Sequence, residues 1–408
     1  MTAVLFEPTT IRGMELANRF VRSATWEGLA DAEGRATPEL VRLYGELAAG
    51  KVGLIISSHA FVIPEGKAGT EQLGAHDDAV IPALRQLVAA VREAGGKMAL
   101  QVAHAGLWAA SGDAEAAERT QPLGPSVRQR EAGPVGREMT SDDLASVIRA
   151  FGGAAARAKA AGCDAVQIHA AHGYLLSEFL SPLFNRRTDA YGGSRANRAR
   201  LVVEVVAAVR AAVGPDYPVL IKMNSEDFVA GGLTVDDMLE SAGLIADAGV
   251  DAIELSGGTS LSGDLGPIRT KHGIPADREA YYEDAALRLK QKVSVPVMLV
   301  GGIRSLEAAE RLVEHGFADY IALSRPLISE PGLVARWERG DREPATCRSC
   351  NHCFYRGLKR ESVYCKHAKR EPSEASGEHV RAPDREQRPE ERRERRNERR
   401  NARHRRSE

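Results

Sequence analysis

The chain has no long hydrophobic run and almost no net charge. No stretch of its 408 residues approaches the roughly 18 consecutive apolar residues that a transmembrane helix needs. The start, Met1 to Thr10, has neither the basic residues nor the apolar core of a secretory signal. The formal net charge is -1, although residues 381–408 hold twelve arginines against seven acidic residues. We therefore expect a cytoplasmic protein without membrane association.

Cysteine is scarce, and its distribution is uneven. One of the five cysteines, Cys163, stands alone, and the other four form a Cys-x2-Cys-x2-Cys-x11-Cys pattern: Cys347, Cys350, Cys353 and Cys365. In a cytosolic protein such a cluster indicates metal ligands rather than disulfides. Cysteines at every third position favour a [4Fe-4S] cluster. Zinc, which more often uses separated Cys-x2-Cys pairs, and no metal at all are the alternatives.

Short β-like runs alternate with longer amphipathic segments along most of the chain. Runs such as Val219–Ile221 are apolar throughout, as strands covered on both faces should be. Eight strands, each followed by a helix, predict an α/β fold, the (β/α)8 TIM barrel. The alternative is a doubly wound open sheet, but no Gly-x-Gly-x-x-Gly follows the first strand. The predicted strands are Phe20–Arg22, Gly53–Ser57, Met98–Gln101, Ala165–Ile168, Val219–Lys222, Ala252–Leu255, Val297–Val300 and Tyr320–Leu323.

Three regions follow one another along the chain. We expect the barrel to span residues 1–340, a cysteine-rich metal-binding segment residues 341–370, and a disordered charged tail residues 371–408. The tail has almost no apolar residues and cannot bury enough surface to fold alone. Its interleaved glutamates and its lack of aromatic residues weigh against a nucleic-acid-binding arm. The predicted barrel helices are Pro38–Ala48, Val80–Ala94, Ser141–Ala160, Ala196–Ala212, Val235–Ala248, Asp284–Lys292, Leu306–His315 and Glu330–Trp337.

Three hydrogen-bonding side chains follow the predicted strand at Ala165–Ile168. His169, His172 and Tyr174 would emerge together at the C-terminal end of that strand, where barrel enzymes place their active sites. In the alternative interpretation, the histidines cap turns and the tyrosine packs sideways. A long segment rich in Gly, Pro and Ser, Ala105–Thr140, is expected to form a loop over the mouth of the barrel.

The last two strands end in residues suited to an anion. Gly301 and Gly302 expose backbone amides after the seventh strand, and Ser324 with Arg325 follows the eighth. This is the usual phosphate position of such barrels, although the glycines could serve only a tight turn.

Two further polar side chains lie opposite each other in the predicted barrel. The amide of Gln101 can bind the edge of a pyrimidine-like ring. Lys222 can stabilise negative charge on a reduced ring, or it can form a salt bridge with Glu226 or Asp227.

Several motifs together carry a resemblance to a known family. They are Leu5-Phe6-Glu7-Pro8 with Asn18-Arg19, the run from Leu100 to Gly106, the run Asn-Arg-Arg-Thr-Asp-Ala-Tyr-Gly-Gly-Ser from Asn185 to Ser194, and the run from Ala322 to Pro326. With them, the chain from Leu5 to about Trp337 resembles the old yellow enzyme family, which comprises FMN-dependent (NADH:flavin) barrel oxidoreductases.

The resemblance implies a role for each candidate residue. The flavin-ring contacts would be Ala24, Ala60 and Gln101. Lys222 would lie beside flavin N1 and O2, and the phosphate ligands would be Gly302, Ser324 and Arg325. Trp26 stands where many relatives have Thr or Cys beside the flavin, so it is expected at the cofactor and would crowd the site.

The resemblance also implies a reaction. NADH or NADPH would reduce FMN, and the flavin would then deliver hydride to an activated C=C bond of a small enone or enoyl thioester. His169 and His172 would hold the conjugated carbonyl oxygen, and Tyr174 would supply the proton.

The cysteine segment is similar to the cluster loop of 2,4-dienoyl-CoA reductase and trimethylamine dehydrogenase, including Asn351. In those relatives, the cluster passes electrons between FMN and a further domain or a partner. An electron-transfer flavoprotein or reductase is therefore an expected partner, and a homo-oligomer is an open alternative. The alternative functions are a flavin dehydrogenase of amine type that uses the cluster, and a non-catalytic metal-stapled binding barrel.

Overall fold

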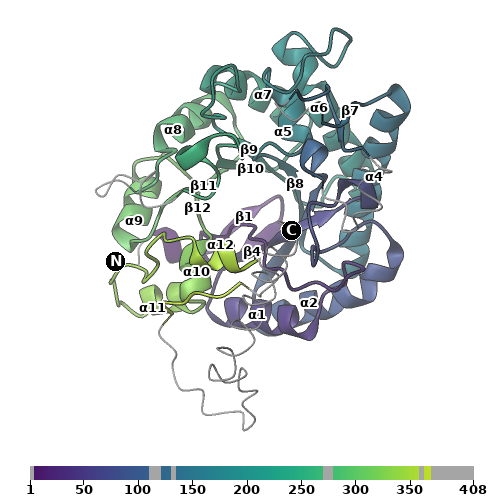
Figure 1. Ribbon diagram of the computed structural model, residues 1–408. Coiled ribbons are helices and arrows are strands. Elements are labelled where there is room, and N and C mark those ends of the chain that lie inside the picture. Colours follow the sequence, from purple (N-terminus) through teal and green to yellow (C-terminus); the bar gives the residue numbers. More distant parts are fainter. Residues whose placement is uncertain (1–3, 110–120, 130–134, 270–278, 358–362, 369–408) are drawn as a thin grey trace, which may run out of the picture. The chain divides into compact units, whose positions relative to one another are not determined.

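Eight parallel strands form a closed barrel in chain order (Figure 1). The computed structural model describes residues 4–109, 121–129, 135–269, 279–357 and 363–368. The last strand pairs with the first, with Ile321 opposite Phe20, and this pairing closes the barrel. The predicted fold is therefore confirmed. The strands are β3 (Phe20–Arg22), β4 (Leu54–Phe61), β5 (Lys97–Ala103), β8 (Ala165–Ala170), β9 (Val219–Asn224), β10 (Ala252–Ser256), β11 (Val297–Val300) and β12 (Tyr320–Leu323).

Helices surround the barrel (Figure 1), and local chemistry sets several of their ends. Thr140 and Thr234 each form a capping box with an aspartate three residues later, which satisfies backbone N–H groups at the helix start. The first of these helices ends at Gly162, whose φ of 89° favours glycine. The helices are α1 (Pro38–Ala49), α2 (Ile81–Glu93), α4 (Ser141–Ala161), α6 (Arg195–Val213), α7 (Val235–Asp247), α8 (Glu283–Lys292), α9 (Leu306–Glu314) and α11 (Leu333–Glu338).

An N-terminal hairpin closes the end of the barrel at which the strands begin. Strands β1 (Thr9–Ile11) and β2 (Met14–Leu16) pair in antiparallel fashion. Their apolar side chains pack against inward-facing residues at the starts of the barrel strands, among them Leu54 and Ala165. Since this end is filled by hydrophobic side chains, a ligand has to enter from the opposite end, where the strands finish.

The segment after α11 returns to that opposite end. The backbone N–H of Ala345 donates to the carbonyl of Arg304 at 2.7 Å, and Val363 N–H donates to the carbonyl of Glu27 at 3.2 Å. These acceptors follow β11 and β3, so the cysteine segment lies on loops at the mouth of the barrel. Short helices that the sequence pattern did not predict are α5 (Leu175–Leu180), α10 (Arg325–Ser329) and α12 (His352–Gly357).

The predicted charged tail, residues 371–408, lies entirely outside the described residues. Among the helices of the described residues, none combines the length and the hydrophobicity that crossing a membrane requires.

Candidate active site

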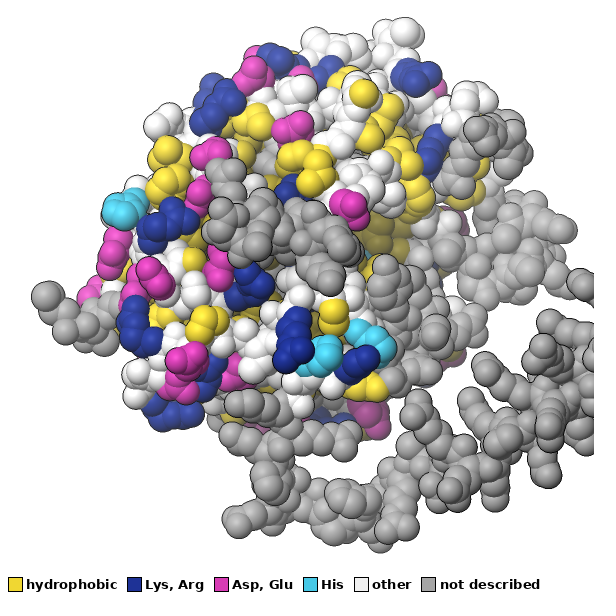
Figure 2. Space-filling view, turned by 60° about the vertical axis from the view of Figure 1, so that its left-hand side comes forward, with side chains coloured by type: hydrophobic (Ala, Val, Ile, Leu, Met, Phe, Trp, Pro, Cys, Tyr) yellow, Lys and Arg dark blue, Asp and Glu magenta, His cyan; other side chains and the backbone are white. Residues whose placement is uncertain are grey.

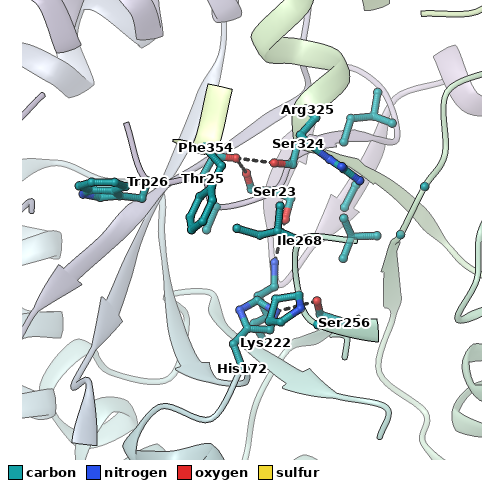
Figure 3. Close-up of a pocket in the computed structure, with 18 of the residues that line it drawn as sticks. Ser23, Thr25, Trp26, His172, Lys222, Ser256, Ile268, Ser324, Arg325 and Phe354 are labelled. Carbon is teal, nitrogen blue, oxygen red and sulfur yellow. Dashed lines mark hydrogen bonds between the residues drawn. The ribbon is translucent and has the colours of Figure 1, made fainter. Parts of the chain in front are cut away.

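A cavity of about 490 Å³ lies at the C-terminal ends of the barrel strands (Figure 3). Its size is in the ordinary range for small-molecule sites, roughly 300–1,000 Å³. Most of the residues that the sequence singled out line it together: Ala24, Trp26, Gln101, His169, His172, Tyr174, Lys222, Gly301, Gly302, Ser324, Arg325, Cys347 and Cys353.

Ala60 is the exception among the predicted flavin contacts. Its side chain is fully buried in the large hydrophobic cluster that includes the outer helices, and it is not among the described residues that line the cavity. Its neighbour His59 lines the cavity instead. The pairing of β4 with β5 shifts register between Ile56 and His59. Such an irregularity changes which side chains face inward, and simple alternation along the sequence could not reveal it.

Three histidines and a tyrosine meet at one side of the cavity. The ring centroids of His169 lie 5.2 Å from His172 and 5.1 Å from Tyr174. The Tyr174 hydroxyl lies 3.4 Å from Nε2 of His59. Sequence analysis assigned His59 no role. Its signal was its position, one residue before an expected flavin contact.

Hydrogen bonds orient the two histidines that follow β8. The backbone N–H of Ala171 donates to Nδ1 of His169 at 3.4 Å, so a neutral His169 carries its proton on Nε2. His172 has a left-handed backbone, with φ 66°, and its N–H donates to Oδ1 of Asn224 at 3.0 Å. Its Nε2 lies 2.8 Å from the hydroxyl of Ser256 (Figure 3). The two imidazoles are therefore held in place before any ligand binds.

Burial sets the protonation states of this group at neutral pH. It lowers the pKa of His59 to about 4 and the pKa values of His169 and His172 well below the usual value for histidine. It raises the pKa of Tyr174 to about 12. The imidazoles are consequently neutral and the phenol is protonated, so the site presents hydrogen-bond donors without a positive charge on the rings.

A connected polar network crosses the floor of the cavity. Glu254 is fully buried and accepts from Nζ of Lys222 at 2.9 Å and from the hydroxyl of Ser23 at 2.6 Å. The side-chain amide of Gln167 donates to the same carboxylate at 2.9 Å, and Gln101 donates to Gln167 at 2.6 Å. Lys222 thus pairs with Glu254, rather than with the downstream acidic residues considered from the sequence. Neither Glu254 nor Gln167 was predicted, because each lies inside an otherwise apolar strand.

At the other end of the cavity, two glycines allow a ligand to approach the backbone closely. Gly301 and Gly302 have φ values of 134° and 79°. A Cβ atom built on Gly302 would lie 2.7 Å from the ring of Tyr281, so the turn requires glycine in both conformation and space. Ser324 and Arg325 follow β12, and the hydroxyl of Ser324 lies 2.8 Å from that of Thr25. Bare backbone and a guanidinium suit the phosphate of FMN, and the cavity accommodates a molecule of that class.

The loop after β3 is anchored by a buried ion pair. Arg22 pairs with Glu27, and each side chain is less than 5% exposed. The hydroxyl of Tyr44 also donates to Glu27, at 3.0 Å. This arrangement fixes the intervening residues, including Trp26. Figure 3 shows the indole at one edge of the cavity, apart from Lys222 and His172.

The four clustered cysteines line one small pocket beside the cavity. Among the described residues, no group of three or more Cys, His, Asp or Glu side chains has the arrangement of a metal site. The pocket is bordered by basic side chains, namely Arg325, Arg348, His352, Lys366 and His367. Figure 2 shows Lys or Arg and His side chains grouped on one face of the molecule.

Comparison with known proteins identifies the family. The sequence profile of the NADH:flavin oxidoreductase / NADH oxidase family matches residues 4–343. The chain belongs to this family. Membership confirms the predicted resemblance to the NADH:flavin oxidoreductases.

Individual relatives agree with this assignment. The chain is 35% identical to an NADH oxidase of Thermoanaerobacter brockii over 352 residues, 85% of this chain and 52% of the relative. It is 35% identical to an NADPH dehydrogenase of Geobacillus thermodenitrificans over 333 residues, 81% of this chain and 92% of the relative. A solved complex of 2-naphthoyl-CoA reductase superposes with a TM-score of 0.82 at 27% identity, covering 90% of this chain and 57% of that chain. The chain thus spans about half the length of the NADH oxidase.

Proposed function

We propose that this family member binds FMN in the described cavity and uses electrons from NADH or NADPH to reduce C=C bonds conjugated to a carbonyl. The observation that carries the proposal is the neutral trio of His169, His172 and Tyr174 at one side of a cavity that has a basic, glycine-rich far end. Bound FMN would supply hydride transfer. The side chains of the protein would bind and polarise the substrate and move the proton.

The two histidines would hold the carbonyl oxygen of the substrate. Nε2–H of His169 is directed by the bond at Nδ1, and His172 is fixed through Asn224 and Ser256. Donors fixed before the reaction stabilise negative charge as it develops on that oxygen, without the cost of reorganisation. The N–H groups of these neutral imidazoles favour a ligand oxygen over an amine cation, because an amine cation cannot accept a hydrogen bond.

Tyr174 would donate the proton to the carbon that does not receive hydride. Its raised pKa keeps the phenol protonated at every pH at which the enzyme is expected to work. The hydroxyl lies 3.4 Å from Nε2 of His59. That imidazole would return a proton from Nε2 to the phenolate while it takes one up at Nδ1.

The cofactor would be held along the cavity by residues already described. Gln101 and Lys222 would bind the pyrimidine side of the flavin ring, and Ala24 and Trp26 would flank the ring. Gly301, Gly302, Ser324 and Arg325 would bind the phosphate. For Ala60, whose side chain packs away from the cavity, the proposal is limited to its backbone.

The cysteine pocket is proposed to hold a [4Fe-4S] cluster, with zinc as the alternative. The support is that four thiols border one pocket and that two of them, Cys347 and Cys353, also line the flavin cavity. The basic side chains around this pocket suit an acidic electron-transfer partner, such as a flavoprotein or reductase. An amine-type dehydrogenase that sends its electrons through the cluster is the second candidate.

One sequence of measurements separates these candidates. The protein is purified without oxygen, and its visible spectrum and its iron and zinc contents are recorded. NADH or NADPH is then added, followed by cyclohexenone. Flavin that bleaches with the nicotinamide and recovers with the enone supports the proposal. Flavin that bleaches only with an amine supports the second candidate, and a colourless protein that does not bind added FMN contradicts both.

A further inference from the structure

We propose that Glu254 is a positioning residue that fixes the hydrogen-bond polarity of Gln101 and holds Lys222, the two groups expected to bind the pyrimidine side of the flavin. The inference rests on the proposed FMN site. Glu254 lies inside β10 with no exposed surface, and it is not among the described residues that line the cavity. Its influence on a ligand must therefore pass through its neighbours.

The polarity follows from what each group can donate or accept. Glu254, paired with Lys222 at 2.9 Å, is a carboxylate that can only accept hydrogen bonds. The NH2 group of Gln167 must therefore face it, at 2.9 Å, and the carbonyl oxygen of Gln167 must face away. That oxygen accepts the NH2 group of Gln101 at 2.6 Å. The acceptor oxygen of Gln101 is left for the cavity.

Glu254, Gln167 and Gln101 therefore form a directed chain of hydrogen bonds, called the relay below. It runs from a carboxylate to an amide that is expected to bind the ligand. An isolated glutamine could present either its oxygen or its NH2 group to a ligand, at little difference in energy. With the relay in place, Gln101 presents an acceptor suited to a ring N–H, and no rotation of its amide is needed on binding. A buried network with every donor matched is rigid, because any flip would place two donors or two acceptors against each other.

The same carboxylate also sets the charge at the floor of the cavity. Glu254 offsets the charge of Lys222, and the hydroxyl of Ser23, at 2.8 Å from Nζ and 2.6 Å from the carboxylate, bridges the pair. The ammonium is thereby held in one place, and the Lys222–Glu254 pair has little net charge. Removing the carboxylate would leave the lysine charge uncompensated, which favours a ligand that carries negative charge.

A double-mutant cycle tests the relay without touching the ion pair. Gln167→Leu breaks the link between Glu254 and Gln101 but leaves Lys222 and Ser23 on the carboxylate. We expect this variant to weaken FMN binding, measured by quenching of flavin fluorescence, by about tenfold. In a Gln101→Leu background, the same change should have less than about a twofold effect, because the two residues act as one unit. Equal effects in both backgrounds would overturn the relay.

A second measurement tests the charge. Glu254→Gln should favour the reduced over the oxidised form of FMN by about tenfold, a rise in midpoint potential of about 30 mV for a two-electron couple. Lys222→Met should shift the potential in the opposite direction. An unchanged potential in Glu254→Gln would overturn this part of the inference. Glu178→Gln is the matched control, since Glu178 is equally buried but accepts from the backbone of Leu107, outside the cavity wall.

Folding and cofactor binding are checked separately. Circular dichroism and thermal melting of each variant show whether it folds. Gln167→Met, which keeps an unbranched chain of similar length, replaces Gln167→Leu if that variant does not fold. If the wild-type protein fails to bind FMN, the proposed function fails. If the wild-type protein binds FMN but the cycle is additive and the potential is unchanged, only the present inference fails.

Discussion

Oδ1 of Asn351 accepts a hydrogen bond from Nη1 of Arg325 at 2.6 Å. The asparagine is only 4% exposed, and its Nδ2 donates to the carbonyl of Ile268 at 3.0 Å. The same Nη1 of Arg325 donates to the carbonyl of Arg269 at 2.7 Å. One amide of the cysteine segment therefore ties together the residues after β12 and the loop after β10, at the end of the cavity where the phosphate of FMN is proposed to bind.

Replacing Asn351 should weaken cofactor binding. Asn351→Ala removes an acceptor from the Arg325 guanidinium, a loss of about 1.5–3 kcal/mol for a hydrogen bond to a charged group. We expect about a tenfold or larger rise in the Kd for FMN, measured by fluorescence quenching. Asn351→Asp keeps an acceptor at the same place and is the control. Wild-type affinity in Asn351→Ala would show that Arg325 is positioned without the cysteine segment.

Replacing Tyr174 should separate the two halves of the proposed reaction. Tyr174→Phe keeps the ring and removes the proton donor, so reoxidation of the flavin by cyclohexenone should slow by about a hundredfold or more. Flavin reduction by NADH or NADPH needs no such proton and should change little. Stopped-flow absorbance resolves the two steps. If both steps slow equally, the hydroxyl contributes to the architecture of the cavity rather than to proton transfer.

Much of the barrel could be predicted because its strands and helices are long runs of one pattern. The strand Val219–Asn224 is buried along its whole length, and its apolar run was visible in the sequence. The hairpin formed by β1 and β2 was missed, because neither strand is followed by a helix, so the pair stands outside the strand-helix alternation on which the prediction rested. Short helices such as α5 were missed because six residues carry too little of a helical pattern.

Sequence motifs were sufficient to predict some residues of the candidate site. Contacts that depend on how distant strands pack together were missed. His169, His172 and Tyr174 follow a recognisable strand, and their grouping in the cavity agrees with the expectation. The partner of Lys222 could not be predicted, because Glu254 is distant in sequence and faces it only through the parallel pairing of β9 with β10. The predicted loop over the mouth, Ala105–Thr140, lies partly outside the described residues.

The proposed substrate-reducing step should be nearly independent of pH over a wide range. Burial lowers the pKa of His59 to about 4 and those of His169 and His172 well below the usual value, so the imidazoles stay neutral on acidification past pH 6.5. Burial raises the pKa of Tyr174 to about 12, so the proton donor is retained in mild base.

The rate of flavin reoxidation by cyclohexenone, measured by stopped flow, should therefore stay within about twofold from roughly pH 6 to pH 10, where none of these groups titrates. A fall in rate on acidification through pH 6.5 would mean that a histidine of ordinary pKa controls the step. A fall on raising the pH through 10 would assign the proton to a phenol exposed to water.

Metal content should depend on the clustered cysteines and not on the isolated one. Cys347→Ala removes one of the four thiols around the small pocket, whereas Cys163→Ala removes a buried thiol in the main core and is the matched control. If the pocket holds a [4Fe-4S] cluster, anaerobically purified wild-type protein and Cys163→Ala should both contain about four iron atoms per chain, and Cys347→Ala far fewer.

Iron and zinc analysis with electron paramagnetic resonance of the dithionite-reduced protein checks this expectation. About one zinc atom per chain would identify a structural zinc site instead. Equal metal content in Cys347→Ala and wild type would remove that thiol from the ligand set.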